Sequence, residues 1–286
     1  MSDKLLLLGS TGKMGLALEE VFKEGYQVMG KNSRDFDAGD FGQVRRLIEE
    51  SCPDIVLNCV ALLGVGPCEN EPEKAFRLNT LYPKFLAELS QEKGFLLVHF
   101  STDAVFNDKQ KGFCTEQDIP CPLNTYGLTK YGGDCFVQNI AKRYYIFRVS
   151  VLFGETSKET QFVERMLQKI KKGEKRLRIS GDIISSPTYS KDVAREVKRI
   201  LGKKLAYGLY HISNKGKASL YDLMKEVVKA LGEDVLIEKC SHKDFPCIGI
   251  KNTSTPLRSK KISPLRPWQE AVKEYCGNIR KSFGKD

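Results

Sequence analysis

The stretch 5-LLLLGSTGKMG-15 decides the fold of this chain. Four leucines lead directly into glycines at positions 9, 12 and 15, and the residues after them have helical periodicity. Glycines in such a strand-to-helix turn let the backbone approach a pyrophosphate, whose charge then lies at a helix N-terminus with unpaired N–H groups. The spacing therefore predicts a first strand, a phosphate-binding turn and a first helix.

Further short apolar runs alternate with helical patterns through the first two-thirds of the chain. Their nearly continuous apolar character is typical of strands that are buried on both faces of a parallel sheet. The order predicts an α/β fold, a Rossmann-like doubly wound parallel sheet. The expected strands after the first are 26–29, 54–59, 95–100 and 144–149, with a late strand in GLYHIS (208–213).

After about residue 150 the alternation loosens, and the pattern predicts a second, smaller α/β region, a cap that we expect to be the substrate-binding domain. We expect residues 1–155 with 176–215 to form the NAD(P)-binding domain and residues 156–175 with 216–286 to form the smaller cap. The elements expected around and in the cap are a basic helix at 160–172, a helix at 219–231, a strand at 235–239 and a last helix at 267–283.

The composition limits the functional class. The chain has 286 residues, 41% of them apolar, and a formal charge of +10, as suits a globular protein with a basic surface. No apolar run approaches the roughly 20 residues of a membrane span, so no membrane partner is expected. The basic run 168–179 lacks interleaved aromatic residues, so no nucleic-acid partner is expected either. Nine scattered cysteines without a CxxC pair argue against disulfides or zinc and favour the cytoplasm, and no Asp/His cluster indicates a metal.

The residues after the second strand bear on the choice of dinucleotide. An acidic side chain there would bond the ribose hydroxyls and favour NAD, but 30–34 contains none. Lys31 and Arg34, on either side of Asn32, favour the 2′-phosphate of NADP(H). The alternative reading, in which both cations are solvated loop residues, keeps NAD(H) open.

Tyr126 and Lys130 lie four residues apart in NTYGLTKYGG (124–133), so on a helix they share a face. An ammonium near a phenol lowers the pKa of the tyrosine from about 10, and such a phenol can give a proton to an alkoxide forming from a carbonyl. By itself the pair is more often explained as part of an amphipathic surface. Ser101 and Thr102 add hydroxyls at the carboxyl end of the fourth strand, where ligands bind in open α/β sheets. The glycine turn, the hydroxyls and the Tyr–Lys pair together predict a dinucleotide-dependent proton-donor site.

With this order of motifs the chain resembles the extended short-chain dehydrogenase/reductases, and within them the dTDP-4-dehydrorhamnose reductase family. The resemblance runs over most of the chain, and the STD-x-VF box followed by PLN-x-YG-x-TK is its most specific part. It is carried by PDIVLNCVA (53–61), ENEPEKAFRLNT (69–80), STDAVFND (101–108), TEQDIPCPLNTYGLTKYGGD (115–134), FRVSVLFG (147–154), SSPTYSKDVA (185–194) and LRPWQEAVKEY (265–275).

The resemblance implies hydride transfer from NADPH, or from NADH, to the C4 carbonyl of a nucleotide-linked 4-keto-6-deoxy sugar, with the proton from Tyr126. It implies that the catalytic residues are Thr102, Tyr126 and Lys130. The residues expected to bind the cofactor are Gly9, Thr11, Gly12, Lys13, Met14, Gly15, Lys31, Asn32, Arg34, Phe36, Asp37, Asn58, Ala61, Ser101, Tyr126 and Lys130. Those expected to bind the substrate are Leu63, Asp103, Val151 and Arg258.

The chain departs from the family pattern on the substrate side. NCVALLGVG (58–66) stands where the family usually has NAAAYTAVD, and Val151 stands where a tryptophan lies against the sugar. Thr255 replaces an arginine, for which Arg258 is a partial substitute. These changes suggest a differently shaped sugar. Two other functions stay open, a non-catalytic NADP-binding regulatory subunit and a nucleotide-sugar epimerase of the same superfamily, and a homodimer is one open assembly.

Overall fold

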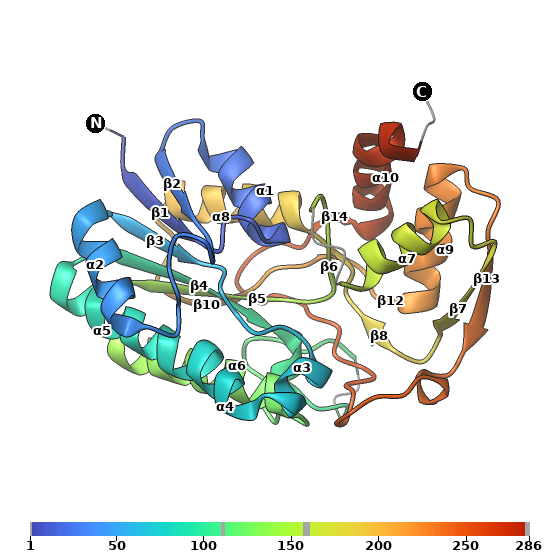
Figure 1. Ribbon diagram of the computed structural model, residues 1–286, viewed down its shortest axis with the longest axis horizontal. Coiled ribbons are helices and arrows are strands. Elements are labelled where there is room, and N and C mark those ends of the chain that lie inside the picture. Colours follow the sequence, from blue (N-terminus) through green and yellow to red (C-terminus); the bar gives the residue numbers. More distant parts are fainter. Residues whose placement is uncertain (1, 110–111, 157–160, 284–286) are drawn as a thin grey trace.

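A six-stranded parallel sheet forms the centre of the larger part of the protein (Figure 1). The computed structural model describes residues 2–109, 112–156 and 161–283. The order of the strands across the sheet is β2-β1-β3-β4-β5-β10, and every neighbouring pair is parallel. The predicted Rossmann-like α/β fold is confirmed. The strands are β1 (Lys4–Leu8), β2 (Gln27–Lys31), β3 (Ile55–Asn58), β4 (Leu96–Thr102), β5 (Tyr144–Val149) and β10 (Gly208–His211).

The leucine run of β1 is continuous because both faces of the sheet are covered. Leu5 and Leu7 pack into one apolar cluster and Leu6 and Leu8 into another, and all four are fully buried. A buried leucine side chain stabilises the fold by about 2 kcal/mol relative to an exposed one, so alternation with polar residues would weaken one of the two clusters. The run therefore fits β1 as an interior strand of the sheet, between β2 and β3.

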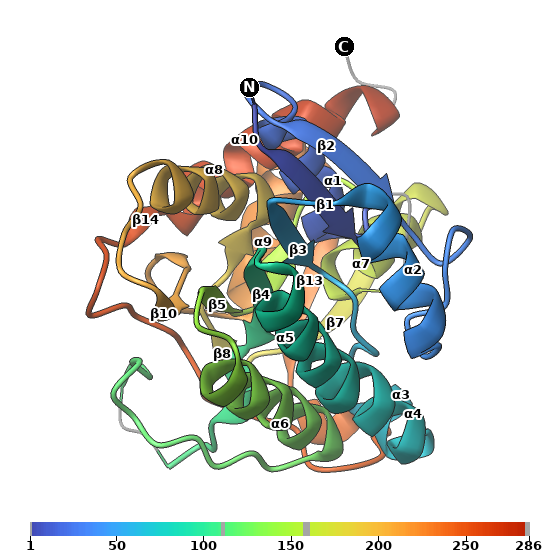
Figure 2. The ribbon, with the colours of Figure 1, turned by 90° about the vertical axis from the view of Figure 1, so that its left-hand side faces the viewer.

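Helices form a layer on each face of the sheet. α1 (Lys13–Phe22) and α8 (Ser190–Gly202) cover one face. The other face is covered by α2 (Phe41–Ser51), α5 (Tyr82–Lys93) and α6 (Thr125–Ile140), of which α5 and α6 run side by side (Figure 2). The segment before α5 contains α3 (Val65–Asn70), α4 (Pro72–Phe76) and a π-helical turn at Arg77–Leu81.

The strand order reverses at β1, because β2 lies on one side of it and β3 on the other. In open α/β sheets ligands bind outside the carboxyl ends of the strands at such a switch point. The glycine turn follows β1 directly, so the fold brings the predicted phosphate-binding residues to this crevice.

A second, smaller core lies at the other side of the molecule. Here β7 (Arg176–Ser180) pairs in parallel with β13 (Leu236–Cys240), and α7 (Phe162–Lys171), α9 (Leu220–Leu231) and α10 (Trp268–Ile279) pack around them (Figure 1). The short strands that connect the two parts are β6 (Leu152–Phe153), β8 (Ile184–Ser185), β9 (Thr188–Tyr189), β11 (Asn214–Lys215), β12 (Ala218–Ser219) and β14 (Leu265–Pro267).

The packing of β7 differs from the expected division of the chain. Residues 176–215 were expected to belong to the larger domain, but Leu177 and Ile179 pack in the smaller core because β7 pairs with β13. We therefore propose a division that moves β7 to the smaller region and keeps α8 and β10 with the large sheet. The last helix ends at Ile279 and a 3₁₀ turn follows it, and residues 157–160 of the expected cap lie outside the described residues.

Glycines let α6 approach the rest of the larger core closely. A Cβ at Gly133 would lie 2.3 Å from the carbonyl oxygen of Asn79, and one at Gly127 would lie 2.1 Å from that of Ala104. Both oxygens belong to the backbone, so no side-chain rotation could relieve the overlap. The position of α6, which carries Tyr126, thus depends on these glycines.

One buried ion pair joins the glycine turn to the smaller region. The Lys13 ammonium lies 2.8 Å from Glu164 Oε1 of α7 and donates to the Leu152 carbonyl at 2.7 Å. The two side chains are 3% and 7% exposed. Burial lowers the pKa of Lys13, and the charge of Glu164 acts in the opposite direction. Loss of either partner would leave the other charge buried without compensation.

We expect Gly133→Ala to lower the free energy of unfolding by about 1–3 kcal/mol, because the added Cβ would push α6 from Asn79. Gly277→Ala is the control, since a Cβ there meets nothing within 4 Å in α10, and it should stabilise the protein by up to about 1 kcal/mol. Urea unfolding followed by circular dichroism measures both. Equal urea midpoints for Gly133→Ala and the parent protein would refute the close approach.

We expect Lys13→Met to lower the free energy of unfolding by about 3 kcal/mol, because it leaves Glu164 charged and buried without its partner. In the double variant Lys13→Met/Glu164→Leu no charge stays buried, so most of that loss should be recovered. Urea midpoints of the single and double variants test this. A double variant less stable than Lys13→Met alone would contradict it.

Candidate active site

A cleft of about 990 Å³ opens at the carboxyl ends of the central strands. It brings together the glycine turn after β1, the loop after β2, the segment after β3, the end of β4, the first turn of α6 and the start of α7. The sequence-predicted residues that line it are Gly9, Thr11, Gly12, Lys13, Met14, Gly15, Asn32, Phe36, Asp37, Ala61, Leu63, Ser101, Thr102, Asp103, Tyr126, Lys130 and Val151.

The glycine turn has the geometry of an anion cradle. Gly9 has a φ of +86°, and a Cβ on Gly15 would lie 2.3 Å from the Gly9 carbonyl oxygen. Gly12 begins α1 without a side-chain cap, so the first N–H groups of the helix remain available to a phosphate. Lys13 lines the cleft, but its ammonium is bound to Glu164 and Leu152. The backbone, rather than this lysine, is therefore the donor set that fits a pyrophosphate.

Two polar contacts fix the first turn of α6. Asn124 caps the helix, and its Oδ1 accepts a hydrogen bond from the Gly127 N–H at 2.9 Å. Glu69 of α3 accepts from both the N–H and the hydroxyl of Thr125, at 2.8 and 2.7 Å. The residue between these contacts is Tyr126, whose place in the cleft wall is thereby set by its neighbours on both sides.

Tyr126 and Thr102 share a hydrogen bond. Thr102 is the last residue of β4, two residues beyond the strand end expected from the sequence, and its hydroxyl donates to Asp103 Oδ1 at 3.2 Å and accepts from the Ala104 N–H at 3.1 Å. Burial raises the pKa of Tyr126 well above its ordinary value, and the bond with Thr102 only partly offsets this. At neutral pH the phenol therefore keeps its proton.

Lys130 does not produce the expected lowering of the Tyr126 pKa. Its ammonium donates to the carbonyl of Phe100 at 2.6 Å, and it is 2% exposed. Burial lowers the pKa of Lys130 itself to about 8, while the carboxylate of Asp134 acts to raise it. Burial is the largest influence on Tyr126, so its pKa is raised although a lysine lies one helical turn away.

Two hydroxyl groups bind the carboxylate of Asp103 in the cleft wall, and a third hydroxyl, that of Ser101, is unpaired among the described residues. Asp103 Oδ2 accepts from Ser150 Oγ and from Thr255 Oγ1, both at 2.8 Å, and burial raises the pKa of its carboxyl group. Thr255 thus meets Asp103 where the family pattern has an arginine. The Ser101 hydroxyl is buried and has no partner among the described residues, which leaves it free to bind a ligand in the cleft.

Three residues expected to bind the cofactor do not line the cleft. Lys31 belongs to β2, where its carbonyl accepts from the N–H groups of Gly9 and Ser10. Arg34 is exposed beside the cleft, next to the lining residues Asn32 and Ser33.

Asn58 is buried beneath the floor of the cleft. Its Oδ1 accepts from the Val60 N–H at 3.0 Å and its Nδ2 lies 3.1 Å from His99 Nδ1. These contacts use both ends of the amide, so it acts below the cleft wall rather than on a ligand.

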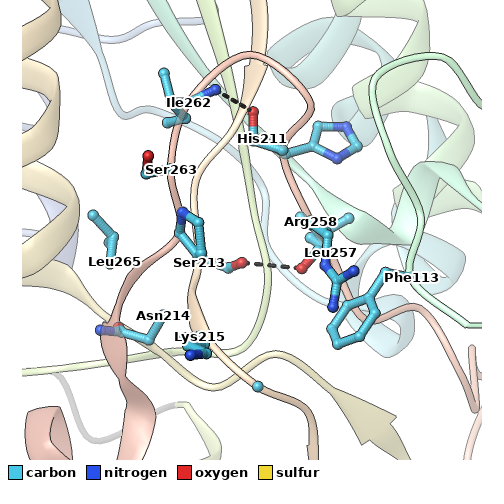
Figure 3. A pocket seen from close by; sticks show the side chains of 13 residues that line it. Phe113, His211, Ser213, Asn214, Lys215, Leu257, Arg258, Ile262, Ser263 and Leu265 are labelled. Atoms are coloured by element: carbon cyan, nitrogen blue, oxygen red, sulfur yellow. Dashed lines mark hydrogen bonds between the residues drawn. The ribbon is translucent and has the colours of Figure 1, made fainter.

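Arg258 lies in a different pocket, of about 100 Å³ (Figure 3). Its guanidinium is 4.2 Å from the centre of the Phe113 ring, a cation–π contact that holds it there. Figure 3 shows Arg258 beside Phe113 and Leu257, with Ser213 and Lys215 on the neighbouring segment. The expectation that Arg258 replaces the arginine of the family at the substrate is not met.

Several lining residues were missed in the sequence. Ser150 follows β5 at its carboxyl end, so the rule that identified Ser101 and Thr102 could have found it. Gln161 and Phe162 reach the cleft from the start of α7, and no local signal predicts this because it depends on how the smaller region packs. Within residues 2–109, 112–156 and 161–283, no three His, Cys, Asp or Glu side chains are grouped to hold a metal. The helices in the same ranges are all too short or too polar to cross a membrane.

Comparisons with known proteins agree with this geometry. The family model described as RmlD substrate binding domain matches residues 3–281. The spore coat polysaccharide biosynthesis protein SpsK of Bacillus subtilis is 32% identical, over 95% of this chain and 96% of its own length. The dTDP-4-dehydrorhamnose reductase of Aggregatibacter actinomycetemcomitans is 29% identical, over 97% of this chain and 98% of its own length.

Two solved structures have closely similar folds. A dTDP-4-dehydrorhamnose reductase from Clostridium acetobutylicum superposes with a TM-score of 0.90 at 30% identity, over 97% of this chain and 99% of the other. One from Bacillus anthracis, in complex with NADP, gives 0.91 at 26% identity, over 97% and 100%. The resemblance read from the sequence is confirmed: the chain belongs to the RmlD substrate binding domain family, which includes the dTDP-4-dehydrorhamnose reductases.

Proposed function

We propose that this protein is an NADPH-dependent reductase that acts on the C4 carbonyl of a nucleotide-linked 4-keto-6-deoxy sugar. The observation that carries the proposal is the placement of Tyr126, Thr102 and Lys130 on one wall of a cleft whose other end is the glycine turn. A dinucleotide bound on that turn would extend along the switch point toward the phenol. The relatives that are dTDP-4-dehydrorhamnose reductases, one of them solved with NADP, support the same reaction class.

The residues present fit a nicotinamide dinucleotide. The uncapped N-terminus of α1 and the left-handed turn at Gly9 would hold its pyrophosphate. Phe36 and Asp37 line the cleft at the end of β2 and would flank the adenosine. The unpartnered Ser101 hydroxyl and the Lys130 ammonium would bind at the nicotinamide end. When bound, NADPH supplies the hydride, and NADH is the alternative donor.

The side chains of the cleft supply the proton. Because burial holds the pKa of Tyr126 above its ordinary value, the phenol is protonated at neutral pH and can donate to an alkoxide that develops on the substrate. The hydrogen bond with Thr102 orients the phenol and partly offsets the effect of burial on its pKa. Lys130, one turn further along α6, would stabilise the phenolate that remains.

We also propose a cytoplasmic location, because all nine cysteines are free thiols, as in a reducing compartment. A homodimer is the assembly that we propose for the protein in solution, and light scattering of the purified protein decides between dimer and monomer. A regulatory subunit would need no buried proton donor, so the Tyr126 site favours the enzyme over that alternative.

Tyr126→Phe should lower kcat by at least about 100-fold, because the variant keeps the shape of the side chain but lacks the proton. NADPH affinity, measured by fluorescence, should stay close to that of the parent. The assay is loss of reduced-nicotinamide absorbance with dTDP-, CDP-, GDP- and UDP-linked 4-keto-6-deoxy sugars. A variant that retained most of the activity would refute the assignment of the donor, and a parent protein inactive on every sugar would refute the proposed function.

Arg34→Ala should raise the KM for NADPH about tenfold and leave the KM for NADH unchanged, because only NADPH carries the 2′-phosphate that this exposed cation can bind. Arg46→Ala is the matched control, an equally exposed arginine on α2 away from the cleft. Equal effects of Arg34→Ala on the two cofactors would contradict the proposed phosphate contact.

A further inference from the structure

Lys130 lies on a buried polar network beneath the cleft. Its Nζ donates to the Phe100 carbonyl at 2.6 Å, and His99 Nε2 lies 3.4 Å from the same nitrogen. Lys130 is 2% exposed and His99 is fully buried. Both contacts come from β4, the strand that ends at Thr102, so the lysine and the hydroxyl are positioned by one element.

The hydrogen bonds of Asn58 fix the tautomer of His99. Asn58 Oδ1 accepts from the Val60 N–H at 3.0 Å, so its Nδ2 is the end that faces His99 Nδ1 at 3.1 Å. An amide nitrogen only donates, so His99 Nδ1 must accept. Burial and the charge of Lys130 hold the pKa of His99 well below its ordinary range, so the ring is neutral and carries its one hydrogen on Nε2.

In this tautomer two hydrogen-bond donors face each other, one on His99 and one on Lys130. The Nε2–H of His99 faces the Lys130 nitrogen, and an ammonium has no lone pair to accept it. A neutral amine at Lys130 would have a lone pair that could accept this hydrogen bond. His99 therefore favours the uncharged form of Lys130, in the same direction as burial.

Asp134 acts on the charge of Lys130 in the opposite direction to His99. It is fully buried on α6, one turn after Lys130, and its Oδ2 accepts from Arg148 Nε of β5 at 3.0 Å. Its Oδ1 has no hydrogen-bond partner among the described residues and lies 3.9 Å from His99 Nε2. The carboxylate raises the pKa of Lys130 and so favours the ammonium.

We propose that His99 and Asp134 are positioning residues that act on the charge of Lys130 in opposite directions, His99 through the tautomer that Asn58 imposes and Asp134 through the orientation that Arg148 imposes. The consequence for the reaction rests on the proposed reductase function, in which a charged Lys130 is the active form. Among the residues that the structure describes, the other titratable groups near Lys130 are two thiols and a phenol. None of them carries a charge at neutral pH, and they are Cys59 after β3, Cys68 of α3 and Tyr126 of α6.

The opposed roles predict pH shifts of opposite sign. Lys130 of the parent protein should titrate near pH 8, and Asp134→Asn should move this midpoint down by about one pH unit because the attracting carboxylate is gone. His99→Asn keeps an acceptor near Asn58 but removes the Nε2–H, so the midpoint should move up. The measurement is the NMR titration of the lysine ε-methylene signal in ¹³C-lysine-labelled protein, assigned by its absence in Lys130→Arg.

Two further variants separate this effect from general loss of packing. Asp134→Glu keeps the carboxylate and should restore a midpoint close to that of the parent. Asp192→Asn removes another buried carboxylate, one that is paired with Arg266 away from Lys130, and should leave the midpoint unchanged. If Asp134→Asn and His99→Asn leave the midpoint at the value of the parent, or move it in the same direction, the proposal is overturned.

Should either substitution prevent folding, Asn58→Ala provides the decisive variant. It keeps both His99 and Asp134 but removes the amide that forces His99 Nδ1 to accept. The ring can then carry its hydrogen on Nδ1 and present the Nε2 lone pair to Lys130, so the midpoint should rise. An unchanged midpoint in Asn58→Ala would overturn the role of His99.

The same shifts should appear in catalysis. Activity falls as pH rises through the Lys130 pKa, so the falling limb of the kcat profile should move to lower pH in Asp134→Asn and to higher pH in His99→Asn. A purely structural role would lower kcat at every pH without moving the limb. The NMR titration needs no substrate, so a protein that reduced no nucleotide sugar would refute the proposed function while leaving this test intact.

Discussion

The close contact of α6 with the backbone around it is the constraint on which the site depends. Because Gly127 and Gly133 lack side chains, the helix approaches the carbonyls of Ala104 and Asn79, and its inner face reaches the end of β4. That contact buries the Lys130 ammonium against the Phe100 carbonyl and brings Tyr126 to Thr102. A helix displaced by the width of one methyl group would separate the phenol from the hydroxyl, so the chemistry follows from a packing distance.

Burial raises the pKa of Tyr126 and lowers the pKa of Lys130. It keeps the proton on Tyr126 and makes the proton on Lys130 easier to lose, because in both cases the uncharged form is favoured. A proton donor benefits from the first effect, whereas a lysine that must stabilise a phenolate is weakened by the second. The carboxylate of Asp134, held by Arg148, offsets this weakening without coming into contact with the ligand cleft.

The large sheet could be predicted because its signals are local. The leucines of β1 and the glycine turn depend on burial and backbone geometry within a few residues, and they gave the fold and the end of the cleft that fits the pyrophosphate. The place of Arg258 could not be predicted, since it depends on Phe113, nearly 150 residues away in sequence. The altered role of Lys13 has the same cause, because Glu164 reaches it only through the packing of the smaller region. The predicted shift of the Tyr126 pKa was wrong in direction, because the spacing of residues in the sequence indicates their proximity but not their burial.

The part of the cleft near Asp103, where we propose that the sugar binds, offers no unpaired cation among the described lining residues. Among the described residues that line the cleft, the cations are Lys13 and Lys130, and both ammonium groups are already engaged by the protein. Asp103 receives hydroxyls from Ser150 and Thr255 instead of an arginine, so no cation compensates its carboxylate there. Leu63 and Val151 also line the cleft, with apolar side chains. A sugar in this part of the cleft would therefore be selected by its shape and by hydroxyl contacts, while the proton chemistry at Tyr126 can stay the same for sugars of different shape.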